Sequence, residues 1–462
     1  MALLKTLFRL KPPHSNSHHQ GLYRCLTASD LVVMGIGAIV GAGIFVLTGI
    51  AAAKQAGPAI TLSYVLASFV CGCSALAYAE LASSVGGCGG AYTYAFVGIG
   101  EFIAWLIGWD LLLEYGMNAA TISIGWGGYL QSILQTCGIT IPKALSADPF
   151  NGGIVNLPAM SIVLLLAAVL SIGTRESARF NKIIVIIKLA VIAIFIGIAT
   201  FCFDPAKWKP FMPFGVKGIV NGAGFIFFAY LGFDAISTTA EEVVNPARDL
   251  PIGILVSLVI CTILYVIVAG LLTGIMYYPE LNVTSPVSTA LLHVGYKLSS
   301  EVVAIGAIAG LTTAIFAMYY GCTRVYLAMS RDGLIPKLFT NIHPRSRSPR
   351  QLVWFLGSIM ALIAGFLPID QIANIVNIGA LAAFAGVSIS VVVLRRTKPD
   401  MPRPFKTPWS PFIPILGVVM CLYLMGSLPL ITWVSFFTWM AVGLVFYFGY
   451  SRFNSVLHSP SS

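Results

Sequence analysis

Charged residues are scarce in this sequence. They make up 10% of its 462 residues, whereas globular domains carry about 25%. Long hydrophilic stretches are also missing, and apolar runs of about 20 residues recur along almost the whole chain. These two absences exclude a soluble globular core. A composition that is 58% hydrophobic predicts an all-α polytopic membrane protein with about twelve spans, short loops and one membrane domain.

Patterns of metal ligands and nucleophiles are missing as well. The nine cysteines are scattered, mostly through apolar runs, without the paired spacing of a zinc site. The six histidines all fall in predicted tails or loops, which argues against a histidine proton relay. We therefore expect no metal, no cofactor, no disulfide framework and no enzyme activity.

The N-terminus lacks the apolar core of a cleavable signal, so residues 1–29 are interpreted as a cytoplasmic tail. Most Lys and Arg residues fall on one side of the predicted spans, which is the positive-inside pattern. Both termini, including residues 456–462, are therefore expected in the cytoplasm. The net charge of +10 then indicates topology and contact with anionic membrane lipid, and no nucleic-acid partner is expected.

One apolar run is too rich in glycine to remain helical. Residues 35–45 read GIGAIVGAGIF, with four glycines within nine positions. Each glycine in a helix interior costs about 0.8–1 kcal/mol against alanine. A backbone that opens at membrane depth is tolerated only where it is buried in protein or lines a cavity. The pattern predicts a break in span 1, and the alternative is close helix packing through small residues.

A second irregular span follows at residues 227–234, FFAYLGFD, where the acidic Asp234 follows Gly232 two positions later in mid-span. The two irregular spans are numbers 1 and 6. A pair of interrupted segments at matching positions in two halves is typical of an inverted-repeat transporter with a site at the midplane. We expect a first repeat at residues 30–203, a second at 216–396, and two further spans at 397–455.

Smaller features complete the predicted topology. Residues 91–134 are expected to hold a short surface helix followed by a tilted span 3. Residues 174–182 are expected to form an inner loop carrying Arg175, Arg179 and Lys182.

Five motifs in this order resemble the amino acid–polyamine–organocation superfamily, and most closely its bacterial cationic amino acid transporters: GAIVGAGIF (37–45), GWDLLLEY (108–115), FAYLGFD (228–234), EEVVNPARDLP (241–251) and SRDG (330–333). The resemblance covers nearly the whole chain. It implies a LeuT-type fold of five plus five inverted spans in a bacterial inner membrane. It also implies alternating-access uptake of amino acids, usually driven by protons.

A free amino acid has two charged ends, and a dry pocket must match both. The break in span 1 can offer backbone N–H groups to the carboxylate; its predicted contacts are Ile39, Gly41, Ala42 and Gly43. Ala42 stands where the family often has a hydroxyl residue, so the carboxylate must rely on the backbone.

The break in span 6 can offer carbonyls of Phe228, Ala229 and Leu231 to the ammonium. The resemblance assigns the same roles to both breaks and makes Phe228 an aromatic gate. The alternative for Phe228 is an ordinary lipid-facing or core aromatic.

Lys188 stands in an otherwise apolar helix, where a lone lysine costs about 2.5–3.5 kcal/mol on insertion scales. We interpret it as a titratable amine beside span 1 that couples transport to protons, and the resemblance supports this role. The alternative is snorkelling of the ammonium to the cytoplasmic surface.

Glu114 in span 3 shares a helical face with Asp110 and Asn118. It is a candidate to pair with a basic substrate or a protonated partner, and the alternative is a structural hydrogen bond to a neighbouring span. Asp234 is a candidate to anchor the second break or to relay a proton, and the alternative is a cap on the second half-helix.

Met318 falls where such folds line the side-chain end of the pocket, and a flexible thioether there suits a small or medium neutral amino acid better than arginine. Glu80, Arg248 and Arg331 are candidates for a cytoplasmic gate, with ordinary surface pairing as the alternative.

The leading hypothesis is a proton-coupled amino acid symporter. The competing hypotheses are a Na⁺-coupled or exchange-only carrier on the same fold, or a non-transporting amino acid sensor. The sequence neither indicates nor excludes a small membrane subunit.

Overall fold

The computed structural model describes residues 9–11, 26–87, 89–172, 177–343 and 348–458. Within these ranges the regular elements are helices, and two isolated β-bridges join Leu26 to Val243 and Ser146 to Asn156. The predicted all-helical architecture is confirmed. The longer α-helices are α2 (Ala28–Ile39), α4 (Ile60–Ser84), α6 (Glu101–Thr136), α8 (Leu157–Ile172), α9 (Ser177–Phe201), α10 (Gly215–Ile226), α11 (Pro246–Ile275), α13 (Lys297–Arg331), α14 (Arg350–Phe366), α15 (Ile369–Thr397), α16 (Phe412–Gly426) and α17 (Leu430–Phe446).

Seven helical segments of the described chain are long and apolar enough to cross a membrane, and three shorter apolar helices accompany them. The seven include a segment of 57 residues, Ala28–Ser84, that folds back on itself. The Tyr64 hydroxyl in α4 donates to the carbonyl of Gly43 at 3.3 Å, and the hydroxyl oxygens of Thr48 and Tyr64 are 2.6 Å apart. A straight helix would separate Gly43 and Tyr64 by about 30 Å, so the chain reverses between them.

Between spans 2 and 4 the chain forms a short helix and then a long one, as predicted, but seven of the eight residues of the short helix are buried, so it does not lie on the protein surface. The short helix α5 (Ala91–Gly98) precedes α6, and α6 is 36 residues long. The prediction for residues 174–182 was wrong in part, because α9 begins at Ser177 and Lys182 therefore lies within the helix. Its ammonium is 3.6 Å from a carboxylate oxygen of Asp30, at the start of α2. Residues 173–176, with Arg175, lie outside the described ranges.

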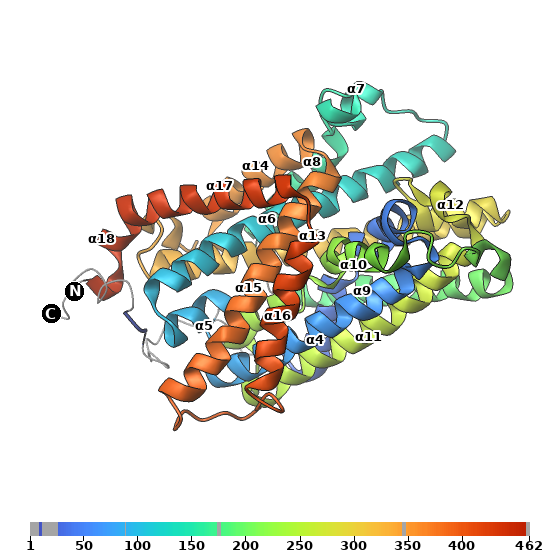
Figure 1. Ribbon diagram of the computed structural model, residues 1–462. Helices are drawn as coiled ribbons and strands as arrows, with labels where there is room; N and C mark the ends of the chain where they lie inside the picture. Colours follow the sequence, from blue (N-terminus) through green and yellow to red (C-terminus); the bar gives the residue numbers. More distant parts are fainter. Residues whose placement is uncertain (1–8, 12–25, 88, 173–176, 344–347, 459–462) are drawn as a thin grey trace.

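The two ends of the described chain meet at one end of the molecule. The Arg9 guanidinium donates to the carbonyl of Leu457 at 3.0 Å, and the Val456 N–H donates to the carbonyl of Asp332. We call this end the terminal face. Figure 1 shows α5 and α18 (Arg452–Asn454) near this end, whereas α7 (Lys143–Ser146) and α12 (Pro286–His293) lie at the opposite end.

Candidate functional site

The first break lies where the glycine pattern predicted it. Helix α2 ends at Ile39, Val40 is extended (φ −73°, ψ 90°), and helical structure resumes as the π-helix η1 (Gly43–Leu47). The N–H groups in the first turn of a helix have no intrahelical acceptors. The backbone around Ala42 and Gly43 therefore presents donors together with the positive end of a half-helix, which suits a carboxylate.

The second break follows α10. A short 3₁₀ turn, η6 (Phe227–Tyr230), leads to extended Leu231 (φ −63°, ψ 139°) and then to Gly232 at φ +122°. That φ is reserved in practice for glycine. A Cβ atom on Gly232 would also lie 2.9 Å from the carbonyl carbon of Ala38 and from the terminal methyl carbon of Met318. The chain continues in a second 3₁₀ helix, η7 (Asp234–Glu242).

The two breaks are in direct contact. The backbones approach so closely at Gly43 that a Cβ atom there would lie 2.3 Å from the Cβ atom of Ala229. Small-residue packing, the alternative for the glycine-rich stretch, therefore coexists with the break.

Tyr265 in α11 also joins the two breaks. Its hydroxyl oxygen is 2.7 Å from the carbonyl of Ile39 and 2.8 Å from the carbonyl of Ala229. One hydroxyl has one proton, so it donates to one of these carbonyls at a time. Sequence reasoning missed Tyr265, which stands in an ordinary apolar helix without a local signal.

Lys188 is fully buried in α9 and points to the first break. Its ammonium nitrogen donates to the carbonyl of Gly37 at 2.9 Å and to that of Val40 at 2.5 Å. These carbonyls have lost helical partners because α2 stops at Ile39. The snorkelling alternative is wrong for this arrangement. On its other side the lysine chain packs on Gly310 of α13, where a Cβ atom would lie 2.8 Å from the lysine Cε.

Asp234 anchors the second break. One carboxylate oxygen accepts the N–H of Gly232 at 3.0 Å, and the other accepts the hydroxyl of Tyr115 in α6. Phe233 is the N-cap residue of η7 and Asp234 is its first residue, so the cap on the second half-helix, the alternative for Asp234, stays a prediction beside the anchor. Sequence reasoning missed Tyr115, although it directly follows Glu114.

Glu114 is fully buried in α6, and neither of its carboxylate oxygens has a hydrogen-bond partner among the described residues. The structural hydrogen bond considered as its alternative is therefore not seen. On the same face, one oxygen of Asp110 and the amide oxygen of Asn118 are likewise buried without a partner in the described chain. Buried unpaired acceptors are costly, so this face of α6 favours a bound cationic or protonated group.

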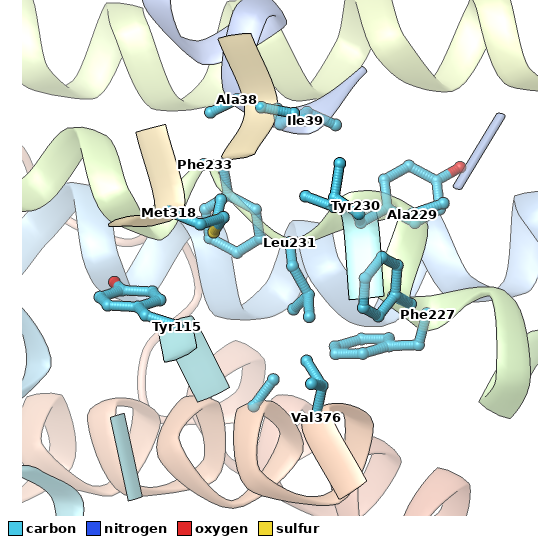
Figure 2. Close-up of a cluster of buried hydrophobic side chains, with 14 of the residues drawn as sticks. Ala38, Ile39, Tyr115, Phe227, Ala229, Tyr230, Leu231, Phe233, Met318 and Val376 are labelled. Atoms are coloured by element: carbon cyan, nitrogen blue, oxygen red, sulfur yellow. The ribbon is translucent and has the colours of Figure 1, made fainter. Parts of the chain in front are cut away.

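The surroundings of the breaks are otherwise apolar. Phe228 is 3% exposed, which excludes the lipid-facing alternative, and Leu231 and Met318 are buried as well. Figure 2 shows Leu231 and Phe233 between Ala38 and Ile39 on one side and Val376 on the other, with Met318 beside Phe233.

The predicted gate residues lie on three different helices, α4, α11 and α13. Glu80 is buried in α4 and pairs with Arg395 at 2.7 Å and Arg403 at 3.6 Å, while the Thr407 N–H donates to it at 2.8 Å. Arg248 is exposed at the start of α11. Beside Arg331, the carboxylate of Asp332 accepts bonds from Lys11 at 2.8 Å and from the Tyr92 hydroxyl at 2.8 Å.

The sequence is similar to those of known proteins. A family model described as amino acid permease matches residues 26–450. The chain belongs to the amino acid permease family. It is 45% identical over 460 residues to a methylthioribose transporter of Bacillus subtilis, covering 98% of this chain and 100% of the relative. It is 46% identical over 449 residues to the branched-chain amino acid permease BcaP of the same organism, covering 96% of each chain.

A more distant relative is human cationic amino acid transporter 4, which is 33% identical over 407 residues, or 87% of this chain and 64% of the relative. These similarities confirm the resemblance to the superfamily. An amino acid permease is an integral membrane transporter and not an enzyme. Among the described residues no group of three or more His, Cys, Asp or Glu side chains could hold a metal ion.

Proposed function

We propose that this permease takes up an amino acid with an apolar side chain by alternating access, in symport with protons. The observation that carries the proposal is the contact between the two breaks at Gly43 and Ala229. One break presents backbone N–H groups and the other presents carbonyls. Together they match the two ends of a zwitterion without a charged side chain, which leaves selectivity to the lining residues.

The lining favours a branched-chain or similar neutral side chain. Phe228, Leu231, Met318 and Val376 are buried and apolar, and none of them offers a partner for a guanidinium or ammonium. A permease for branched-chain amino acids among the relatives supports this class. Glu114 is the residue that favours a cationic group, and we assign it the substrate ammonium or a transported proton.

Methylthioribose is a second candidate substrate because the relative named for it is 45% identical over the whole chain. That sugar has neither a carboxylate nor an ammonium group. The N–H donors of the first break would then bind hydroxyl groups, which gain less from a half-helix end than an anion does. The geometry therefore favours the amino acid.

The position of Lys188 supports proton coupling over Na⁺ coupling. Its ammonium occupies the carbonyls of Gly37 and Val40, which are the oxygen ligands that a Na⁺ ion at this place would need. A cation there would also meet a positive charge. We propose that Lys188 gives up and regains a proton as the break moves, and that Asp234 takes part in the relay.

The surrounding topology is proposed to be twelve spans in two inverted repeats, residues 30–203 and 216–396, followed by two further spans. The basic residues Arg9 and Lys11 lie at the terminal face, where they bond to Leu457 and Asp332, and this supports a cytoplasmic location for both termini in a bacterial inner membrane. Glu80, Arg248 and Arg331 remain proposed gate residues on that side.

The test is uptake by purified protein in liposomes with an imposed pH gradient. The panel contains labelled leucine, isoleucine, valine, alanine, arginine and methylthioribose. We expect concentrative uptake of the neutral amino acids that persists when external Na⁺ is replaced by choline. Uptake that requires Na⁺, or exchange without accumulation, would support the other carrier types. No transport of any member would support a sensor.

A further inference from the structure

A cavity leads from the two breaks toward the terminal face. It has a volume of about 80 Å³, room for several water molecules, and runs between α2, η7 and α13. Its inner end is lined by Ala38 and Gly232, and its outer end by Leu26, Glu242 and Tyr320. A substrate released toward the terminal face has to pass this outer end.

Three side chains are connected across the outer end. The hydroxyl of Tyr320 donates to a carboxylate oxygen of Glu242 at 2.7 Å, and the Arg324 guanidinium donates to the same oxygen at 3.1 Å. The guanidinium also donates to the Tyr320 hydroxyl and lies 4.5 Å from the centroid of the Tyr320 ring. We call this group the Glu242 triad.

The Glu242 triad connects η7, a 3₁₀ helix, to the long α-helix α13. Glu242 is the last residue of η7, a 3₁₀ helix of nine residues. Runs of 3₁₀ helix longer than three or four residues are uncommon and often mark a hinge. Tyr320 and Arg324 stand one turn apart on α13, a helix of 35 residues.

Two backbone hydrogen bonds also connect the end of η7 to the segment that precedes α2. The Leu26 N–H donates to the carbonyl of Glu242 at 3.0 Å, and the Val244 N–H donates to the carbonyl of Leu26 at 3.0 Å. The segment before α2 is thus tied to the end of η7. A movement of the η7 end therefore moves the start of α2 with it, so both broken helices respond to the Glu242 triad.

We infer that the Glu242 triad is the gate of the release path: it holds the end of η7 against α13, and it must open before substrate leaves toward the terminal face. The ionic contact is well suited to this task. Glu242 is 20% exposed and Arg324 is 5% exposed, so the carboxylate is the partner that can move into water, while the guanidinium keeps the Tyr320 hydroxyl and ring. This gate rests on the proposed transport function and differs from the residues predicted from sequence.

The experiment uses three variants. They are Arg324→Gln, Tyr320→Phe, and a double variant that exchanges the two charges, Glu242→Arg combined with Arg324→Glu. Hydrogen–deuterium exchange of the η7 peptide is measured in lipid nanodiscs without substrate, and uptake and efflux are measured in liposomes. Tyr320→Phe removes one hydroxyl and is the variant safest for folding. The matched control is Lys54→Gln, which breaks the Lys54–Asp370 pair of 3.1 Å on a solvent-exposed surface.

We expect exchange in η7 to rise several-fold in Arg324→Gln and less in Tyr320→Phe, with faster efflux and lower accumulation in the same order. The charge swap should return both readouts toward wild type, and Lys54→Gln should leave both unchanged. Wild-type protection of η7 in Arg324→Gln, or a charge swap that exchanges as fast as the single variant, would overturn the gate. The exchange readout does not use substrate, so it remains decisive even where wild-type protein transports no amino acid and the proposed function fails.

Discussion

Gly43 and Ala229 bring the two unwound segments into backbone contact, and a methyl group on Gly43 would lie 2.3 Å from the Cβ atom of Ala229. Such a distance is well inside ordinary van der Waals contact. The glycine therefore has two roles. It begins the π-helix η1 after the break, and it allows the N–H donors of one break to face the carbonyls of the other.

Gly43→Ala should push the two breaks apart and reduce the initial rate of substrate uptake about tenfold or more. Overpacking costs about 1–3 kcal/mol, and each 1.4 kcal/mol is a factor of ten. Initial uptake rates in liposomes measure the effect. The matched control is Gly72→Ala in α4, where a Cβ atom meets nothing within 4 Å. Equal rates for Gly43→Ala and Gly72→Ala would contradict the contact.

Tyr265→Phe should weaken substrate binding about fivefold while leaving the fold intact. The variant removes the single hydroxyl between the carbonyls of Ile39 and Ala229, and one lost hydrogen bond is worth about 1 kcal/mol. The half-saturation concentration for uptake is the measurement. Tyr319→Phe, whose hydroxyl donates to the carbonyl of Val353 away from the breaks, is the control. An unchanged value for Tyr265→Phe would mean that the hydroxyl does not position the carbonyls.

Local sequence patterns predicted the breaks because their cause is local. Gly41 and Gly43 in the first break, and Gly232 in the second, leave the helix backbone without side-chain cover at membrane depth. Lys188 could be recognised for a similar reason, since a lone lysine in an apolar helix requires an explanation. In each case one residue type in one context carried the signal.

The partners of these residues could not be predicted in the same way. Tyr265 stands 226 residues from Ile39, and Arg395 stands 315 residues from Glu80. Each pairing depends on how distant helices pack, and a tyrosine inside an apolar helix or an arginine in its last turn is common. The Glu242 triad was missed because Arg324 lies within α13 and resembles an ordinary inner-side charge.

Lys188→Ala should abolish accumulation driven by a pH gradient while substrate exchange persists. The ammonium that bridges the carbonyls of Gly37 and Val40 is removed, but the breaks that bind substrate remain. Uptake with and without the gradient, beside counterflow of preloaded substrate, separates the two activities. Lys182→Ala on the same helix, half-exposed near Asp30, is the control and should accumulate normally. Intact concentrative uptake by Lys188→Ala would reject the coupling role.

Met318→Ser should widen the range of accepted amino acids. Met318 is fully buried, and its terminal methyl carbon lies against Gly232 at the second break, so a shorter polar side chain opens space beside Leu231 and Phe233. Large-to-small changes at buried methionines cost about 2–5 kcal/mol of stability, so loss of folded protein has to be separated from altered selectivity. Met360→Ser in α14, a buried methionine away from both breaks, provides that control. Competition of labelled leucine uptake by a panel of larger and cationic amino acids is the measurement. We expect new competitors for Met318→Ser and none for Met360→Ser. If both variants show the same competitor profile, Met318 does not line the substrate pocket. A general loosening of the helical core would then explain the change, because it affects either position equally.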